Sequence, residues 1–164
     1  MENFESLSDE IRSQIKKWEL RLLDFSDEVI ELRKNSQNRT IKQILGHLID
    51  STSNNIHRVV HLQYQGSPFL FPNYATFGNN DRWIAIQDYQ HEDWGNMVQL
   101  CKYMLLHFCH IIKNIDKSKL DNEWIAGQDE VITLRAMVKD FPRHLVLHLT
   151  EIDALANVKE EQES

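Results

Sequence analysis

The chain has 164 residues, 41% of them hydrophobic, and a formal net charge of −7 at pH 7. This length suits a single compact domain, and the acidic balance argues against nucleic-acid binding, which favours a basic surface that displaces phosphate counterions. No apolar run reaches the roughly 20 residues of a membrane span, and the N-terminal stretch lacks the basic and apolar regions of a signal peptide. We therefore expect one cytoplasmic domain over residues 1–164, with short disordered tails, no membrane contact and no nucleic-acid partner.

The first predicted helix begins at Ser8, which is a good N-cap residue, and runs without interruption to Leu32. Apolar residues recur along it at alternating spacings of four and three, the rhythm of a helix that is buried along one side. These residues are Ile11, Ile15, Trp18, Leu22, Phe25, Val29 and Leu32. The polar link that follows is short, so the second helix is expected to return antiparallel to the first.

The second predicted helix starts with Thr40 and Gln43, which are placed as a capping box. Its apolar stripe consists of Ile41, Ile44, Leu45, Leu48, Thr52, Ile56 and Val59. A line of polar side chains borders this stripe, with Asp50 nearby, and is formed by His47, Ser51, Asn54 and Arg58. Such a line indicates either the wall of a cleft or a solvated edge between helices.

Residues 65–90 break the helical rhythm with glycine and proline. About 25 residues are enough to cross the length of a bundle, so the third helix is expected to run parallel to the second. This crossover is rich in large apolar side chains, namely Phe69, Leu70, Phe71, Tyr74, Phe77 and Trp83. They are expected either to pack on the end of the bundle or to roof a pocket.

The third predicted helix carries a seam with the same alternating spacing. Its residues are Trp94, Val98, Cys101, Leu105, Phe108, Ile112 and Ile115. Cys101 falls on this seam and Cys109 beside it, and a helix holds residues at this separation too far apart for a disulfide. We therefore expect two reduced thiols, and the repeated seams predict an all-α four-helix bundle.

A looser polar link that contains Trp124 leads to Thr133, which is predicted to cap the fourth helix. The apolar series of this helix is Leu134, Val138, Phe141, Leu145, Ile152 and Leu155. His148 takes the core position that this series leaves open. Pro142 removes one backbone hydrogen bond and is expected to bend the helix one turn ahead of His144.

His144 and His148 are four residues apart on one helix, a spacing that lets two imidazoles reach one metal ion. Core histidines satisfied by protein partners are the alternative. With the second and third helices parallel, the second and fourth are antiparallel, which brings His47 beside this pair. The remaining histidines point away from a buried site and are not expected to bind metal; they are His57, His61, His91, His107 and His110.

Several segments resemble the DinB-like (YfiT-like) family, over most of the chain from about residue 40 to residue 152. The most specific segments are Gly46-His47-Leu48 with Asp50-Ser51, and Arg143-His144-Leu145 with His148-Leu149; Asn54-Asn55 with Arg58, Ser67-Pro68-Phe69, and Tyr89-Gln90 with Asp93-Trp94 agree in order. The resemblance implies a four-helix bundle with up-down-down-up connections. It also implies a divalent metal, often nickel or zinc, held by three histidines that correspond here to His47, His144 and His148. The chain departs from the family at Pro142, where a helix former is expected, and at Arg39, where members often carry tryptophan.

Three neutral imidazoles leave coordination positions open, as in catalytic metal sites. A water at such a site has its pKa lowered to about 7, and a thiol is favoured as thiolate. Asp50 and Glu151 are the carboxylates best placed to act as a base or to orient a ligand histidine. Asn54, Arg58 and Arg143 are expected to bind the substrate, and helix-face salt links are the alternative for the four charged residues.

Enzymes resembling this family include transferases that add low-molecular-weight thiols to electrophiles. We therefore expect a metal-dependent transferase that uses such a thiol, or a similar nucleophile, on a small-molecule substrate. A hydrolase using metal-activated water is the competing enzyme, and a metal-binding or ligand-binding stress protein without turnover is the competing non-enzyme. A cysteine mechanism is not expected, because neither cysteine has an evident base. A homodimer is a further expectation, with the exposed face of His57 and His61 as its contact.

Overall fold

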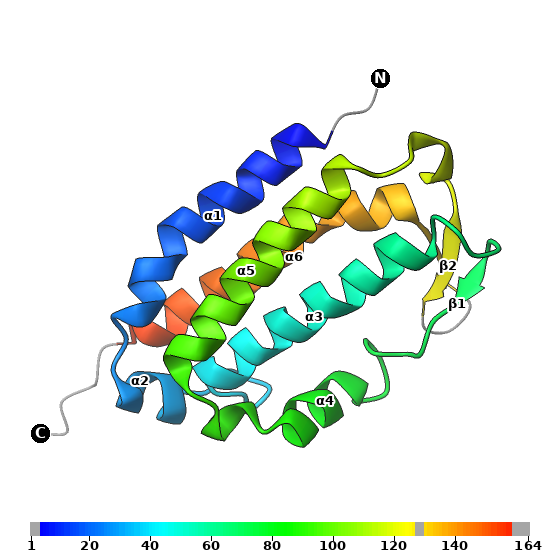
Figure 1. Cartoon of the computed structure of the whole chain (residues 1–164). Helices are drawn as coiled ribbons and strands as arrows, with labels where there is room; N and C mark the ends of the chain where they lie inside the picture. The colour runs from blue at the N-terminus through cyan, green and yellow to red at the C-terminus, as the bar shows by residue number, and fades with distance from the viewer. Residues whose placement is uncertain (1–3, 127–129, 159–164) are drawn as a thin grey trace, which may run out of the picture.

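The computed structural model describes residues 4–126 and 130–158. Four long helices form the bundle: α1 (Glu5–Leu23), α3 (Ile41–His61), α5 (Trp94–Lys113) and α6 (Leu134–Ala156). The helices α3 and α5 run in the same direction, and α1 and α6 run opposite to them (Figure 1). The predicted all-α bundle with up-down-down-up connections is therefore confirmed. None of the helices in the described ranges combines the length and apolarity needed to cross a membrane.

The first predicted helix is wrong at both ends. It starts at Glu5, after Phe4, and Ser8 is buried inside it rather than capping it. It stops at Leu23, and a separate short helix, α2 (Asp27–Leu32), follows. The Ser26 hydroxyl accepts a hydrogen bond from the Val29 amide at 3.4 Å, and acidic residues in the first turn of α2 favour a new helix start there. Because the chain turns at this point, Leu32 leaves the core and is 68% exposed.

The predicted start of α3 is confirmed. The Gln43 amide donates to the Thr40 hydroxyl at 3.3 Å, and the Thr40 amide donates to the Gln43 side chain at 3.0 Å. This reciprocal capping box fixes where α3 begins, and with it the rotation of the polar residues one and two turns later.

The crossover between α3 and α5 contains short regular elements that were not predicted. It contains β1 (Phe69–Leu70), α4 (Asn79–Gln87) and a 3-10 turn, η1 (Tyr89–His91). The Tyr89 ring lies directly against Gly46, where a Cβ would overlap it, so only glycine fits at this point of α3. One turn further along α3, the Tyr89 hydroxyl donates to the Asp50 carboxylate at 2.7 Å. The crossover is thus anchored along α3 rather than looping free.

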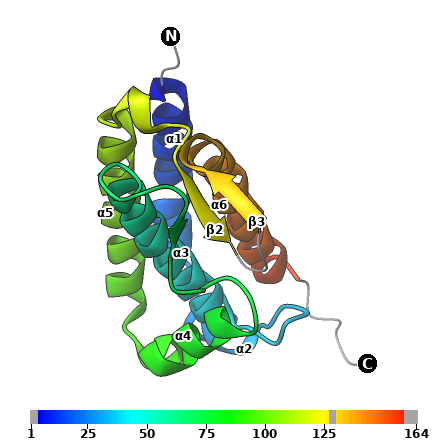
Figure 2. The same ribbon diagram turned by 90° about the vertical axis from the view of Figure 1, so that its right-hand side faces the viewer.

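The link before α6 forms strands, which the sequence analysis did not predict. After the 3-10 turn η2 (Lys117–Lys119), strands β2 (Glu123–Ala126) and β3 (Glu130–Thr133) pair antiparallel, and β1 pairs parallel with β2. Residues of β2 alternate between half-buried and buried, as expected of a strand with one covered face. Figure 2 shows this small sheet at the end of the bundle where α6 begins. It covers the end of the space between α3 and α6.

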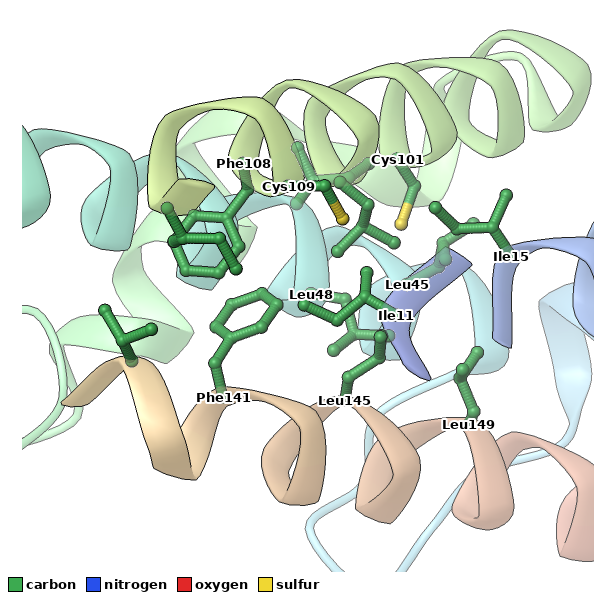
Figure 3. Packing of buried hydrophobic residues seen from close by; sticks show 14 of the residues in the cluster. Ile11, Ile15, Leu45, Leu48, Cys101, Phe108, Cys109, Phe141, Leu145 and Leu149 are labelled. Atoms are coloured by element: carbon green, nitrogen blue, oxygen red, sulfur yellow. The ribbon is translucent and has the colours of Figure 1, made fainter. Parts of the chain in front are cut away.

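The core lies between the four long helices and follows the predicted seams. Figure 3 shows Phe108 of α5 facing Phe141 of α6, and their ring centroids are 4.2 Å apart. The side chains of Leu45 and Leu145 are fully buried, and burial of one such side chain contributes about 1.5–3 kcal/mol. Two residues at the ends of predicted seams, Trp94 and Leu155, are only half-buried. The expectation of a disordered C-terminal tail falls on residues 159–164, outside the described residues.

Candidate metal centre

Three histidines converge between α3 and α6. His47 comes from the first half of α3, and His144 and His148 come from the middle of α6. One nitrogen from each ring lies within 4.8 Å of the other two. The ring centroids are 4.7 Å apart for His144 and His148, 4.7 Å for His47 and His148, and 5.5 Å for His47 and His144. Antiparallel helices bring these segments side by side, and Pro142, which lies inside the continuous helix α6, does not separate them.

Burial keeps the imidazoles of His47 and His144 neutral. Only 7% of His47 is exposed, and burial, followed by the charges of His148, His144 and Arg39, lowers the pKa of His47 to about 3. Burial, followed by the charge of His148, lowers the pKa of His144 to about 4. Near pH 7 both rings therefore carry a nitrogen lone pair, which is the form that binds a metal ion.

Two of the three rings have a hydrogen-bond partner at Nδ1. The Tyr74 hydroxyl lies 2.8 Å from His47 Nδ1, and His148 Nδ1 lies 3.0 Å from the Glu151 carboxylate. Asn35 in turn donates to the other oxygen of Glu151 at 2.7 Å. With Nδ1 engaged on both rings, Nε2 is the nitrogen left for a ligand. Such outer partners fix the tautomer and orientation of metal-binding histidines.

The residues present fit a divalent transition metal. Imidazole nitrogen is a ligand suited to zinc and nickel, and three protein ligands are the usual complement of a catalytic site. Within the described ranges, this is the one group of three or more histidine, cysteine or acidic side chains whose ligand atoms lie this close together. The donor set supports a divalent metal without deciding which one.

A cavity of about 550 Å³ opens beside the histidines. Its α3 wall carries His47, Ser51, Asn55 and Arg58, and its α6 wall carries Met137, Asp140, Phe141 and His144. Tyr74 from the crossover, Trp124 from β2, and Glu130 and Ile132 from β3 also line it. Three residues of the predicted polar line of α3, namely His47, Ser51 and Arg58, thus line a cleft rather than a solvated edge.

Three other predicted site residues, Asn54, Arg143 and Asp50, do not line the cavity. Asn54 does not line this cavity; its side chain donates to the backbone oxygen of Asp50 at 2.9 Å, and Asn55 takes its place in the wall. Arg143 is exposed and forms two bonds, at 2.6 and 2.8 Å, to Asp140 of its own helix, which is the salt-link alternative. Asp50 is buried behind the crossover rather than lining the cavity.

Asp50 holds the crossover in place. Its carboxylate accepts from Tyr89 and from Gln87, both at 2.7 Å, while its second oxygen has no protein partner. Burial raises the pKa of Asp50, and the two hydrogen bonds oppose that rise. These contacts give Asp50 an anchoring role; of the two predicted carboxylates, Glu151 is the one in contact with a histidine of the cluster.

The remaining histidines and both cysteines lie elsewhere. His57 is exposed, whereas His61 was expected to be exposed and is half-buried, with its ring stacked on Phe69 at a centroid distance of 5.7 Å. Both cysteines are free and buried in the core, as Figure 3 shows, and burial raises the pKa of Cys101 to about 12. Neither is a nucleophile for the cavity.

Tyr74, Asn55 and Trp124 were missed as site residues. Asn55 is adjacent in sequence to the predicted Asn54, so the prediction chose the wrong one of two neighbouring residues on α3. Tyr74 belongs to the aromatic crossover, for which a roof over a pocket was one of two expectations. Nothing in the local sequence of Trp124 indicates that its strand reaches the cavity.

Fold and site together define a class of protein: an up-down-down-up helical bundle with three histidines gathered between two of its helices. The structure is similar to that of YfiT from Bacillus subtilis, which is described as a probable metal-dependent hydrolase with an unusual four-helix bundle topology. The match covers 92% of this chain and 82% of that chain, with a TM-score of 0.75 and 16% sequence identity. At this identity the likeness shows that the fold is YfiT-like, as the family resemblance implied. No protein-family model and no curated protein matches the chain.

Proposed function

We propose that the chain is a metal-dependent enzyme that transfers a low-molecular-weight thiol to a small electrophilic substrate. The observation that carries this proposal is the cluster of His47, His144 and His148, of which His47 and His144 line a cavity and have neutral rings at pH 7. Three protein ligands leave coordination positions open toward the cavity, as a catalytic site requires. We propose zinc or nickel as the metal.

The three histidines and their two hydrogen-bond partners have different tasks. The three imidazoles would hold the cation, while Tyr74 and Glu151 would orient His47 and His148 through their Nδ1 atoms. A bound divalent cation would supply Lewis acidity that favours the deprotonated form of a thiol or a water beside it. The cavity walls would hold the electrophile next to that nucleophile and restrict its orientation.

A thiol suits this site because two carboxylates beside the histidines, Asp140 and Glu151, are already engaged. Asp140 is paired with Arg143, whose hydrogen bond lowers the pKa of Asp140, and Glu151 is bonded to His148. A thiol with a pKa near 8.5 needs less help from a base than water does. The thiol has to come with a substrate, because Cys101 and Cys109 are both buried in the core.

Hydrolysis is the second candidate, and the description of YfiT as a probable metal-dependent hydrolase favours it. The two candidates share the metal and the cavity and differ only in whether a thiol or a water attacks. Both therefore require the same three histidines.

Turnover assays separate these candidates. The protein, loaded with zinc or nickel and checked by elemental analysis, is incubated with chlorodinitrobenzene and 2-mercaptoethanol. We expect thiol-dependent consumption that stops with chelator and in His144→Ala but persists in His107→Ala, a change of an exposed histidine. Cleavage of 4-nitrophenyl acetate without thiol, with the same dependence on His144, would instead establish the hydrolase. Tight metal binding without either reaction would leave a metal-binding protein and reject both.

A further inference from the structure

Arg58 is a buried cation that lines the cavity without an acidic partner. Only 7% of it is exposed, and its Nη1 donates to the Asn55 side chain at 3.2 Å. Its guanidinium carbon lies 4.2 Å from the centre of the Trp124 ring. Its Nε has no hydrogen-bond partner, and no carboxylate among residues 4–126 and 130–158 lies within ion-pair distance of it. Burial lowers the pKa of Arg58 to about 10, which reflects the uncompensated desolvation of its charge.

Arg39 is a second buried arginine, and unlike Arg58 it is paired with a carboxylate of the described chain. Arg39 is 6% exposed, and it is paired with Asp81 of α4 through Nε at 2.8 Å and Nη2 at 2.7 Å. Removing a buried cation from water costs free energy unless an anion compensates for it. One buried arginine thus has its anion in the fold, whereas Arg58 does not.

Trp124 adds a second unpaired donor next to Arg58. The side chain is 8% exposed, its ring is stacked on the guanidinium, and its indole N–H has no hydrogen-bond partner among the described residues. Buried N–H groups are satisfied in most proteins, and a pair of unsatisfied donors in one cavity wall calls for an acceptor. Both side chains also border an adjoining hollow of about 470 Å³, so the space continues past them.

We propose that Arg58 and Trp124 form the binding point for a carboxylate group of the substrate. This inference rests on the proposed function, because it assigns one end of the molecule that would react at the histidines. A substrate carboxylate would form an ion pair with the Arg58 guanidinium, which lacks one within the described residues. It would also accept a hydrogen bond from a nearby donor.

The position of Arg58 sets the shape of that substrate. Arg58 follows His47 by eleven residues on the same helix, which is about 16 Å of helical rise. Ser51 and Asn55 lie between them on the cavity wall, and Ile132 and Phe141 supply apolar surface. The substrate class is therefore an elongated small molecule with an apolar middle, a reactive group at one end and a carboxylate at the other.

The charge of the cavity favours a monoanion. Arg58 is the one arginine or lysine among the described lining residues, whereas Glu130 and Asp140 are acidic residues that also line the cavity. A phosphate ester with nearly two negative charges would meet repulsion from these groups that a carboxylate meets only half as strongly. We therefore assign a carboxylate rather than a phosphate.

The test is a calorimetric titration of the full-length protein with 4-phenylbutyrate and with its neutral amide. We expect the carboxylate to bind at least about ten-fold more tightly, the typical effect of a charge-assisted hydrogen bond. In Arg58→Gln this preference should vanish while binding of the amide is unchanged. Arg143→Gln is the matched control, because Arg143 is exposed and already paired, and it should keep the preference.

Further variants guard against misfolding and against binding to the metal. If Arg58→Gln does not fold, judged by circular dichroism, Arg58→Lys and Trp124→Phe should each keep the fold and lose part of the preference. His148→Ala should keep the preference, because this site does not depend on the metal. A carboxylate preference that survives Arg58→Gln but disappears in His148→Ala would overturn the proposal, as would tighter binding of 4-phenylbutylphosphonate than of the carboxylate. Failure of the proposed function would instead appear as absent turnover with the Arg58-dependent preference intact.

Discussion

Two histidine pairs with the same spacing end in different surroundings. His144 and His148 on α6 have ring centroids 4.7 Å apart and lie beside His47 of α3, whereas His57 and His61 on α3 are 6.0 Å apart and meet no third histidine. Spacing on one helix is therefore only half of a metal site. The other half is the antiparallel neighbour that brings the third imidazole, and bundle topology alone decides where that neighbour lies.

A hydrogen bond to a tyrosine does not distinguish the two places. The hydroxyls of Tyr74 and Tyr64 lie 2.8 Å from Nδ1 of His47 and His61, respectively. What differs is burial, because Tyr74 is buried and Tyr64 is 64% exposed. A ring fixed away from water keeps its orientation for a ligand, while a ring at the surface exchanges its partner with solvent.

The largest expected effect comes from removing one ligand of the cluster. We expect His148→Ala to lower the affinity for zinc or nickel by more than about 100-fold, since two imidazoles would remain of three. His61→Ala, at the same position of the other pair, should leave affinity unchanged. Isothermal titration calorimetry with elemental analysis measures both, and equal losses in the two variants would mean that the metal binds elsewhere.

A smaller effect is expected from the carboxylate behind His148. Glu151→Gln keeps the size of the side chain but removes the charge that fixes His148 Nδ1, and it should weaken metal binding by about 10–100-fold. Asp153→Asn, two residues along α6 and paired with Arg21, is the control. A Glu151→Gln variant that binds zinc like the wild type would show that Glu151 does not orient the ligand.

The two tyrosines sharpen the comparison further. Tyr74→Phe removes the hydroxyl beside His47 and should weaken metal binding by about ten-fold, the lower end of the range for outer partners. Tyr64→Phe removes an equivalent hydroxyl beside His61 and should change nothing in metal binding. Competition titrations with a chromogenic chelator resolve a difference of this size.

The bundle could be predicted because its cause is local. Apolar spacing marks the buried side of each helix, and a short link followed by a long one fixes the directions of α1, α3 and α5. The same reasoning failed at Ser26, where a capping residue with acidic neighbours outweighed an unbroken apolar rhythm. It also failed at β1, β2 and β3, because short strands are stabilised by pairing between segments distant in sequence.

The site divides in the same way. The three histidines could be inferred once the helix directions were fixed, because each occupies a defined position on a regular helix. Tyr74 and Trp124 could not, since they reach the cavity from the crossover and the sheet, whose paths depend on tertiary contacts. Asn55 took the place of Asn54 because, at about 100° per residue, the two lie on opposite sides of the line through Ser51 and Arg58, and spacing alone does not decide which side faces the cavity.

The smallest expected effect is on the free energy of unfolding, to which His61 should contribute more than His148. His61 stacks on Phe69 and contacts the edge of Phe71, so it helps to hold the start of the crossover on α3. His61→Ala should therefore lower the free energy of unfolding by about 1 kcal/mol, the usual value of an aromatic pair, whereas metal-free His148→Ala should change it by less than about 0.5 kcal/mol. Urea titrations of both variants in the presence of chelator measure this difference. If His148 stabilises the fold less than His61 does, its position is explained by metal binding and not by packing; the opposite order would make His148 a structural residue.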